Sequence, residues 1–241
     1  ENGQTVQSYG GGVCQVSTTL YNAVLKAELE VTQRSNHSMI VTYVKPSMDA
    51  AIAGDYKDLK FVNNLDAPIY IEGYTVGKDI YFNIYGQETR PSNRKVTYES
   101  EVVSEEDPGT QFVATGDAVG SISTTQGKHM GYVARLWKIV TVDGVEQSRD
   151  AINKSTYKSS PKIVNVGTAS ADPNATAAVN AALATGDEAT IYATVAQYSG
   201  AGQTPAETPA ETPADGSAEA AAILGTVDES QITENTTTEG Q

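Results

Sequence analysis

The spacing of the apolar residues changes once, near residue 30, and this change limits what the chain can fold into. Up to about Leu29 these residues recur at steps of three and four, which is typical of one face of an α-helix. One stripe along that helix contains Val13, Val16, Leu20 and Val24. Beyond it the period is two, which is typical of strands. A helix followed by antiparallel strands predicts an α+β fold for the first part of the chain.

Four segments after this helix have the period of two. The last two flank residues 76–79 and predict a β-hairpin. The expected strands cover residues 40–44, 59–62, 69–74 and 80–85. Residues 1–90 therefore form the first predicted domain.

A second domain is expected at residues 91–168, after a short linker that contains Pro91 and Asn93. Its strands are longer, and Asp143-Gly144 supplies a hairpin turn between two of them. The expected strands cover residues 96–103, 132–142, 145–150 and 163–166. A domain of roughly 75 residues has a thin core, so we expect one twisted all-β sheet with Trp137 partly buried against it.

The acidity of the chain is concentrated in its last part. Residues 169–241 contain 11 of the 30 acidic side chains and none of the 16 basic ones, so they carry −11 of the formal net charge of −14. The sequence Thr204-Pro205-Ala206-Glu207 recurs at 208–211. Such a segment buries too little apolar surface to offset its chain entropy, so residues 169–241 are expected to be a disordered acidic tail.

The charge also excludes one class of function. Residues 1–168 carry only −3 of the net charge and have no basic face for phosphates, so we do not expect a nucleic-acid partner. No apolar stretch reaches the ~18 residues of a membrane span. No signal peptide opens the chain, whose first residue is Glu1. Because the first residue is not methionine, we expect upstream sequence to be missing, with membrane attachment only through a missing N-terminal anchor.

The chain has a single cysteine, Cys14, so it has no internal disulfide. Cys14 lies at the start of the predicted helix, where free N–H groups and the helix dipole stabilise a thiolate. Papain-like enzymes have this layout, with the base on a later segment. The corresponding order here is Cys14 as nucleophile, His37 as base, and Asp49 or Asp58 as the group that orients His37.

A second interpretation of the same residues stays open. Cys14 is then a small buried residue, His37 a solvated loop histidine and Asp49 the cap of a turn. The candidate substrate contacts lie beside Cys14 on the helix: Gln15, Ser17, Thr18 and Tyr21. One cysteine and two distant histidines do not have the spacing of a metal site, so we expect no metal and no cofactor.

The segment Gly10 to Ala23, GGGVCQVSTTLYNA, resembles the signature of the VanW family, named after an accessory protein of B-type vancomycin-resistance clusters. The resemblance continues through Asn36-His37-Ser38, 56–61 and Pro68-Ile69-Tyr70-Ile71, and covers roughly residues 1–88. Residues 96–168 are similar to the G-five modules, small β domains of surface adhesins and wall-processing proteins. That similarity is carried by Thr97-Tyr98-Glu99, residues 142–146 and Val166-Gly167-Thr168.

These resemblances imply an extracytoplasmic protein of the bacterial cell envelope, or a secreted one. The resemblance to the VanW family also implies that the first domain lacks its N-terminal portion, because members carry more sequence before the glycine run. Its implied partner is peptidoglycan or another glycan that contains N-acetylglucosamine. Two functions remain open. In the first, the protein acts on or binds peptidoglycan, as a thiol hydrolase or acyl-transferase if it is an enzyme. In the second, it is a non-catalytic protein that binds the cell wall or a glycan and acts in adhesion. Vancomycin resistance itself is not implied by the family name.

Overall fold

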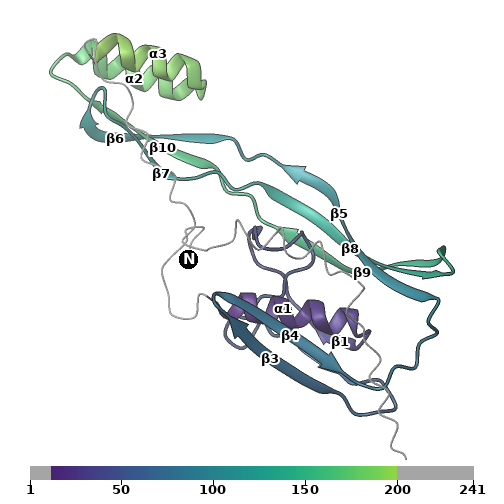
Figure 1. Cartoon of the computed structure of the whole chain (residues 1–241). Coiled ribbons are helices and arrows are strands. Elements are labelled where there is room, and N and C mark those ends of the chain that lie inside the picture. The colour runs from purple at the N-terminus through teal and green to yellow at the C-terminus, as the bar shows by residue number, and fades with distance from the viewer. Residues whose placement is uncertain (1–11, 200–241) are drawn as a thin grey trace, which may run out of the picture.

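The computed structural model describes residues 12–199. Within these residues, one helix and two antiparallel strand pairs come first, six further strands follow, and two helices come last (Figure 1). The first group consists of α1 (Val13–Lys26), β1 (Glu30–Gln33), β2 (Lys60–Val62), β3 (Tyr70–Val76) and β4 (Asp79–Tyr85). The second consists of β5 (Arg94–Glu106), β6 (Thr110–Ala118), β7 (Ile122–Gln126), β8 (Gly131–Val142), β9 (Val145–Tyr157) and β10 (Lys162–Ala169). The last consists of α2 (Pro173–Thr185) and α3 (Glu188–Tyr198).

The strands form two antiparallel pairs and two three-stranded sheets. β1 pairs with β2, and β3 pairs with β4. One three-stranded sheet has the order β5-β8-β9 and is antiparallel throughout. The other has the order β6-β10-β7, in which β10 is parallel to β6 and antiparallel to β7. The expected order of an α+β part followed by an all-β part is confirmed, but the second part has two sheets where one was expected.

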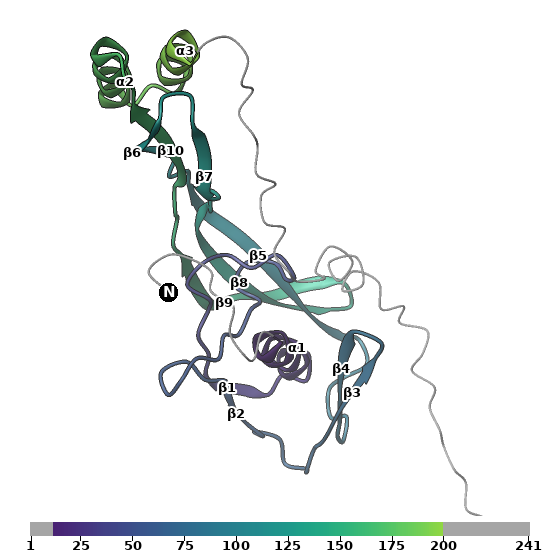
Figure 2. The same cartoon turned by 90° about the vertical axis from the view of Figure 1, so that its left-hand side faces the viewer.

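Helix α1 lies between the β3–β4 hairpin and the β5–β8–β9 sheet, as the view along the helix shows (Figure 2). Its core contains Tyr21 and Leu25 from the helix, Ala50 from the connection between β1 and β2, and Leu136 from β8. The first and second parts therefore share one hydrophobic core. The helix ends at Lys26, three residues earlier than the sequence predicted.

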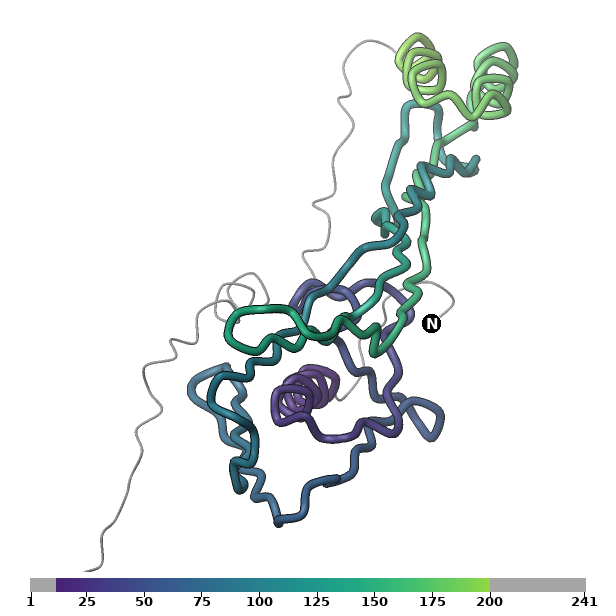
Figure 3. The backbone as a smooth tube through the Cα atoms, turned by 90° about the vertical axis from the view of Figure 1, so that its right-hand side faces the viewer, coloured from purple at the N-terminus to yellow at the C-terminus, as the bar shows by residue number. Residues whose placement is uncertain are grey.

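The connection from β1 to β2 differs from the prediction. Residues 40–44, expected as a strand, form bends without a strand partner. The tube in Figure 3 shows this connection running beside the β5–β8–β9 sheet. Further along the connection, two side chains of this sheet bind its backbone: Ser100 Oγ donates to the carbonyl of Pro46 at 2.6 Å, and Asn153 Nδ2 donates to that of Ser47 at 3.2 Å. These hydrogen bonds attach the connection to the sheet through side chains.

The expected disorder is wrong for residues 173–198, which form α2 and α3. Both helices begin with a capping aspartate: Asp172 accepts from the backbone N–H of Asn174, and Asp187 accepts from that of Thr190. They cover one face of β10 and supply apolar residues that the thin sheet lacks. The resulting cluster contains Val164, Val166, Val179, Ala182, Ile191 and Val195. The rest of the expected tail, residues 200–241, lies outside the described residues.

Candidate functional site

The centre of the site is the buried carboxylate of Asp49, whose side chain has no exposed surface. Its Oδ1 accepts hydrogen bonds from Arg34 Nη2 at 2.7 Å and from the Tyr157 hydroxyl at 2.5 Å. Its Oδ2 accepts the backbone N–H of His37 at 2.7 Å and lies 2.7 Å from Nδ1 of the same histidine. Four donors around one carboxylate fix its position, and one of them, Nδ1, connects the imidazole to it.

These contacts decide the charge state of the network. Burial raises the pKa of Asp49, but the hydrogen bond from His37 and the charge of Arg34 outweigh it, so this pKa lies below its usual value. Burial and the neighbouring Asp49 carboxylate raise the pKa of Tyr157 to about 12. At neutral pH the network therefore contains an ionised Asp49, a charged Arg34 and a neutral Tyr157 that donates its proton.

Residues of β9 complete the network from the second part of the chain. Besides Tyr157, Ser155 Oγ accepts from Arg34 Nη1 at 2.8 Å. Arg34 Nε donates to the carbonyl of Asp49 at 2.6 Å, and its guanidinium lies 5.6 Å from the centre of the Tyr21 ring. Its side chain is only 6% exposed. The site is therefore assembled from segments more than 100 residues apart.

Cys14 is the second residue of α1 and is half-buried. Its Sγ lies 3.6 Å from the carbonyl oxygen of Ile52 and 3.5 Å from the backbone nitrogen of the same residue. Ile52 follows Asp49 by three residues, so their Cα atoms are at most about 11 Å apart. One short segment thus contacts the thiol through the backbone of Ile52 and His37 through the side chain of Asp49.

The structure brings the predicted base and orienting group together, but it gives the thiol another partner. His37 Nε2 faces the hydroxyl of Tyr43 at 3.4 Å, and the two rings meet edge to face. Within residues 12–199, no hydrogen bond joins Cys14 to His37. Asp58, the other candidate orienting group, is 47% exposed and lies 3.7 Å from Lys60.

Three of the four candidate substrate contacts are buried, which corrects the prediction of direct ligand contact for them. Ser17 donates to the carbonyl of Ala50 at 2.5 Å, and Thr18 accepts from the backbone N–H of Ala50 at 3.0 Å. Tyr21 is 2% exposed, in the core below Arg34. These side chains join α1 to the segment that carries Asp49. Gln15 is half-buried in the first turn of α1.

Several residues of the site were not found from the sequence. Arg34 gave one local signal, because it is the only arginine or lysine between Lys26 and Lys45. Tyr43 was assigned to a strand, and Lys57 lies in the segment 56–61 that contributes to the family resemblance, where a solvated turn or the lining of a groove was expected. Tyr157 lies 108 residues from Asp49 along the chain. No local pattern connects residues at that separation.

A cavity lies elsewhere in the described part of the chain. It has a volume of about 740 Å³ and lies at the C-terminal end of α1, between the helix and β4. Its wall includes Glu28, Phe82 and Arg94, and neither Cys14 nor His37 lines it. Among residues 12–199, no group of three or more His, Cys, Asp or Glu side chains is placed to hold a metal ion. No helix in the described part of the chain is long and apolar enough to cross a membrane.

Two solved structures are similar to the second part of the chain. "IgA1 Protease G5 domain structure" is 26% identical, with a TM-score of 0.24, and the match covers 32% of this chain and 94% of that one. "Crystal structure of HP0197-G5" is 20% identical, with a TM-score of 0.17, and the match covers 30% of this chain and 99% of that one.

Sequence comparisons divide the chain in the same order as its two parts. Residues 1–85 match the family model "VanW like protein", and residues 93–169 match the model "G5 domain". "Uncharacterized protein YoaR" of Bacillus subtilis (strain 168) is 37% identical over 86 residues, which are 36% of this chain and 28% of that relative. The chain thus spans less than a third of that relative's length. It contains a VanW-like region at residues 1–85 followed by a G5 domain at residues 93–169.

Proposed function

We propose that this is a cell-wall-associated protein whose VanW-like region acts on peptidoglycan peptides as a thiol hydrolase or acyl-transferase. Cys14 is the nucleophile, His37 the general base and Asp49 the group that orients His37. One observation carries the proposal: the segment from Asp49 to Ile52 contacts both the imidazole and the thiol. The family matches support the association with the cell wall.

The reaction follows the logic of a cysteine–histidine–aspartate triad. Nε2 of His37 takes the proton of Cys14, and the sulfur attacks the carbonyl carbon of a peptide amide. Asp49 holds the imidazole through Nδ1 and stabilises the imidazolium that forms. The tetrahedral intermediate collapses to a thioester as His37 gives its proton to the leaving amine. Water then releases an acid in a hydrolase, or an acceptor amine forms a new amide in a transferase.

The first turn of α1 supplies the electrostatic part of this mechanism. Its free N–H groups and the positive end of the helix dipole favour both the thiolate and the oxyanion of the intermediate. Cys14 must leave Ile52, and His37 Nε2 must turn from Tyr43 toward the sulfur. Catalytic hydrogen bonds are often long or misaligned without substrate and tighten in the complex. Gln15, half-buried beside Cys14, is the proposed substrate contact of this turn.

A second function is favoured by the state of the thiol. Cys14 contacts backbone groups of Ile52, as a structural cysteine would. In this alternative both regions bind without catalysis, and the G5 domain holds a glycan that contains N-acetylglucosamine. Either function places the protein outside the cytoplasm, in the cell envelope or secreted.

The two functions differ in whether a covalent bond in peptidoglycan is broken. The full chain is incubated with purified peptidoglycan and with soluble muropeptides, and the products are identified by mass spectrometry. We expect cleaved or exchanged amides that disappear in Cys14→Ala and His37→Ala. His129→Ala is the matched control, because this second histidine lies in the G5 domain, where its backbone pairs with Ser160.

Products that persist in Cys14→Ala would contradict the thiol mechanism. Peptidoglycan that binds to the wild-type protein and stays chemically unchanged would favour the binding function.

A further inference from the structure

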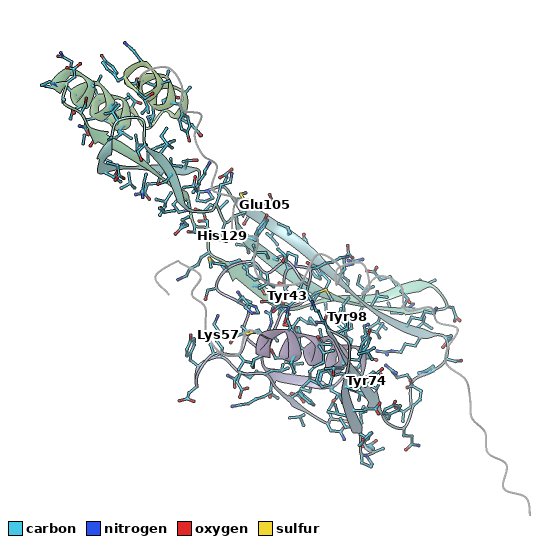
Figure 4. All side chains as sticks on the ribbon, turned by 60° about the vertical axis from the view of Figure 1, so that its left-hand side comes forward. Tyr43, Lys57, Tyr74, Tyr98, Glu105 and His129 are labelled. Carbon is cyan, nitrogen blue, oxygen red and sulfur yellow. The ribbon has the colours of Figure 1, made fainter. Side chains whose placement is uncertain are left out.

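Lys57 connects the two halves of the candidate site. Its backbone forms an isolated antiparallel bridge with Ala53, with N···O distances of 3.1 Å in both directions. Ala53 directly follows Ile52, whose backbone contacts the Cys14 thiol. Figure 4 shows Lys57 beside one end of α1, toward the opposite end from Tyr98. The main chain of Lys57 is thus fixed next to the segment that holds the thiol.

The side chain of Lys57 reaches the other half of the site. Its Nζ donates to the carbonyl of Asn36 at 2.8 Å and to Ser38 Oγ at 3.3 Å. These two residues lie on either side of His37. A single residue therefore joins the segment of the thiol to the segment of the imidazole, and its charge lies between them.

That charge has no carboxylate partner within residues 12–199. Both acceptors of the ammonium are neutral oxygens, and an ammonium has three donors, so one N–H remains for another group. The Asp49 carboxylate is already bonded to Arg34, His37 and Tyr157. Burial lowers the pKa of Lys57, while Asp49 and Cys14 act to raise it. A half-buried cation without a counter-ion attracts an anion more strongly than an exposed lysine does.

We propose that Lys57 binds a carboxylate of the substrate beside Cys14, which restricts the substrate to peptides with a free carboxylate near the reacting amide. The inference rests on the proposed function, because it takes Cys14 as the reacting group. It goes beyond that function by assigning the recognition residue and the chemical class it recognises. The geometry of Lys57 carries it, since the ammonium is held on one side by Asn36 and Ser38.

Two alkylating reagents test this directly on the full chain. Iodoacetate carries a carboxylate and iodoacetamide is its neutral counterpart; each forms an S–C bond with the thiolate and releases iodide. Both reagents react with the same thiolate, so the ratio of their rates does not depend on the thiolate fraction. The ratio reports the electrostatic potential beside Cys14. We expect Lys57→Met to lower the iodoacetate-to-iodoacetamide ratio by roughly 3- to 10-fold, as for a partly screened ion pair. Lys57→Arg should keep most of the ratio.

The matched control is Lys60→Met, because Lys60 is 61% exposed and lies near Asp58. Its ratio should equal that of the wild-type protein. An unchanged ratio in Lys57→Met would overturn the proposal, whether or not the protein cleaves peptidoglycan. If the wild-type protein does not turn over peptidoglycan but its iodoacetate-to-iodoacetamide ratio depends on Lys57, only the proposed reaction would be overturned.

If Lys57→Met does not fold, the wild-type protein is compared with N-acetylcysteine. A ratio no higher than that of the free thiol would overturn the proposal. Protection of Cys14 from iodoacetamide distinguishes the sources of the carboxylate. We expect N-acetylalanine to protect Cys14 from alkylation. N-acetylalaninamide, which lacks the carboxylate, and glucuronate, a sugar carboxylate, should each protect at least 5-fold less. Equal protection by glucuronate would overturn the peptide assignment.

Discussion

At the scale of single residues, Asp49 shows how a buried charge is tolerated. A carboxylate removed from water costs several kcal/mol, and only nearby charges and well-placed donors offset that cost. Here Arg34 supplies the charge, and His37 and Tyr157 supply further hydrogen bonds. The pair Arg34–Asp49 is nearly inaccessible, with side-chain exposures of 6% and 0%. Removing either partner leaves the other charge buried without its opposite charge.

Asp49→Asn should lower the free energy of unfolding by about 3–5 kcal/mol, because it leaves the Arg34 guanidinium buried without a counter-charge. Urea unfolding followed by circular dichroism measures this loss. Asp58→Asn is the control: its ion pair with Lys60 is exposed, so it should change stability by less than about 0.5 kcal/mol. If both variants lost the same free energy of unfolding, the buried network around Asp49 would not stabilise the fold as predicted.

The same residues show which parts of the candidate site can be predicted from local sequence. Cys14, His37 and either Asp49 or Asp58 were proposed from residue types and order, and of the two aspartates Asp49 is the one that contacts His37. Tyr157 could not be found, because its contact with Asp49 is created only when β9 packs beside the connection from β1 to β2. The contact between Cys14 and Ile52 likewise depends on the path of that connection.

At the scale of elements, α2 and α3 form part of the folded structure. The β6–β10–β7 sheet buries Val164 and Val166 only because Val179, Ile191 and Val195 cover them. Composition rich in alanine, threonine and acidic residues predicted disorder, since composition alone does not report which apolar residues face a partner. The few apolar residues of α2 and α3 are sufficient to form a core because they pack against the apolar face of β10.

Ile191→Ala should reduce the free energy of unfolding by about 2–5 kcal/mol, because Ile191 is fully buried against β10 and the change leaves a cavity. Chemical denaturation gives this value. Gln197→Ala, on the exposed side of α3, should leave stability within about 0.5 kcal/mol. A negligible effect of Ile191→Ala would mean that the helix pair does not pack on the sheet in solution.

Two glycines of the same sheet give opposite expectations. A Cβ at Gly167 would fall on the carbonyl oxygens of Ala118 and Asp117, so Gly167→Ala should cost about 1–3 kcal/mol through overpacking. A Cβ at Gly116 meets nothing within 4 Å, so Gly116→Ala should be neutral or stabilise by up to about 1 kcal/mol. The thermal midpoints of the two variants test this: a Gly167→Ala midpoint at or above that of Gly116→Ala would refute the close packing of β10 on β6.

At the scale of the whole molecule, the VanW-like region and the G5 domain behave as one packed structure. Glu28, just after α1, accepts from both terminal guanidinium nitrogens of Arg94, and it lies 2.6 Å from Lys138 Nζ and 3.5 Å from Arg90 Nη1. Tyr98 donates to the carbonyl of Leu25 at 2.5 Å. Because β5 and β8 provide most of these partners, the G5 domain forms a wall of the fold that holds the candidate site.

The Glu28 contacts predict a pH dependence of stability. The hydrogen bond from Arg94 is the main cause that lowers the pKa of Glu28 to about 2, while the unfolded chain keeps a pKa of about 4.3. The folded state therefore gains stability above the unfolded value and loses it as pH falls from about 4.3 to about 2. Urea unfolding between pH 2.5 and 5 measures this. The free energy of unfolding should rise less steeply with pH in Glu28→Gln than in the wild-type protein.

Glu30→Gln is the control, because Glu30 is exposed on β1 and should leave the slope as in the wild-type protein. The difference between the variants removes the contribution of all other carboxylates. Identical slopes for Glu28→Gln and the wild-type protein would contradict a strong ion pair between the two regions.

The sequence by itself determined a part of the elements and the order of the two regions. Periodicity located α1, the β3–β4 hairpin and most of β5, β8 and β10, because these depend on neighbours within a few residues, whereas β1, β6 and β7 were not predicted. The tertiary structure alone decided that residues 40–44 bend, that α2 and α3 cover β10, and that Tyr157 reaches Asp49. Each of these outcomes depends on contacts between segments distant in the chain, where burial and hydrogen bonding override local preference.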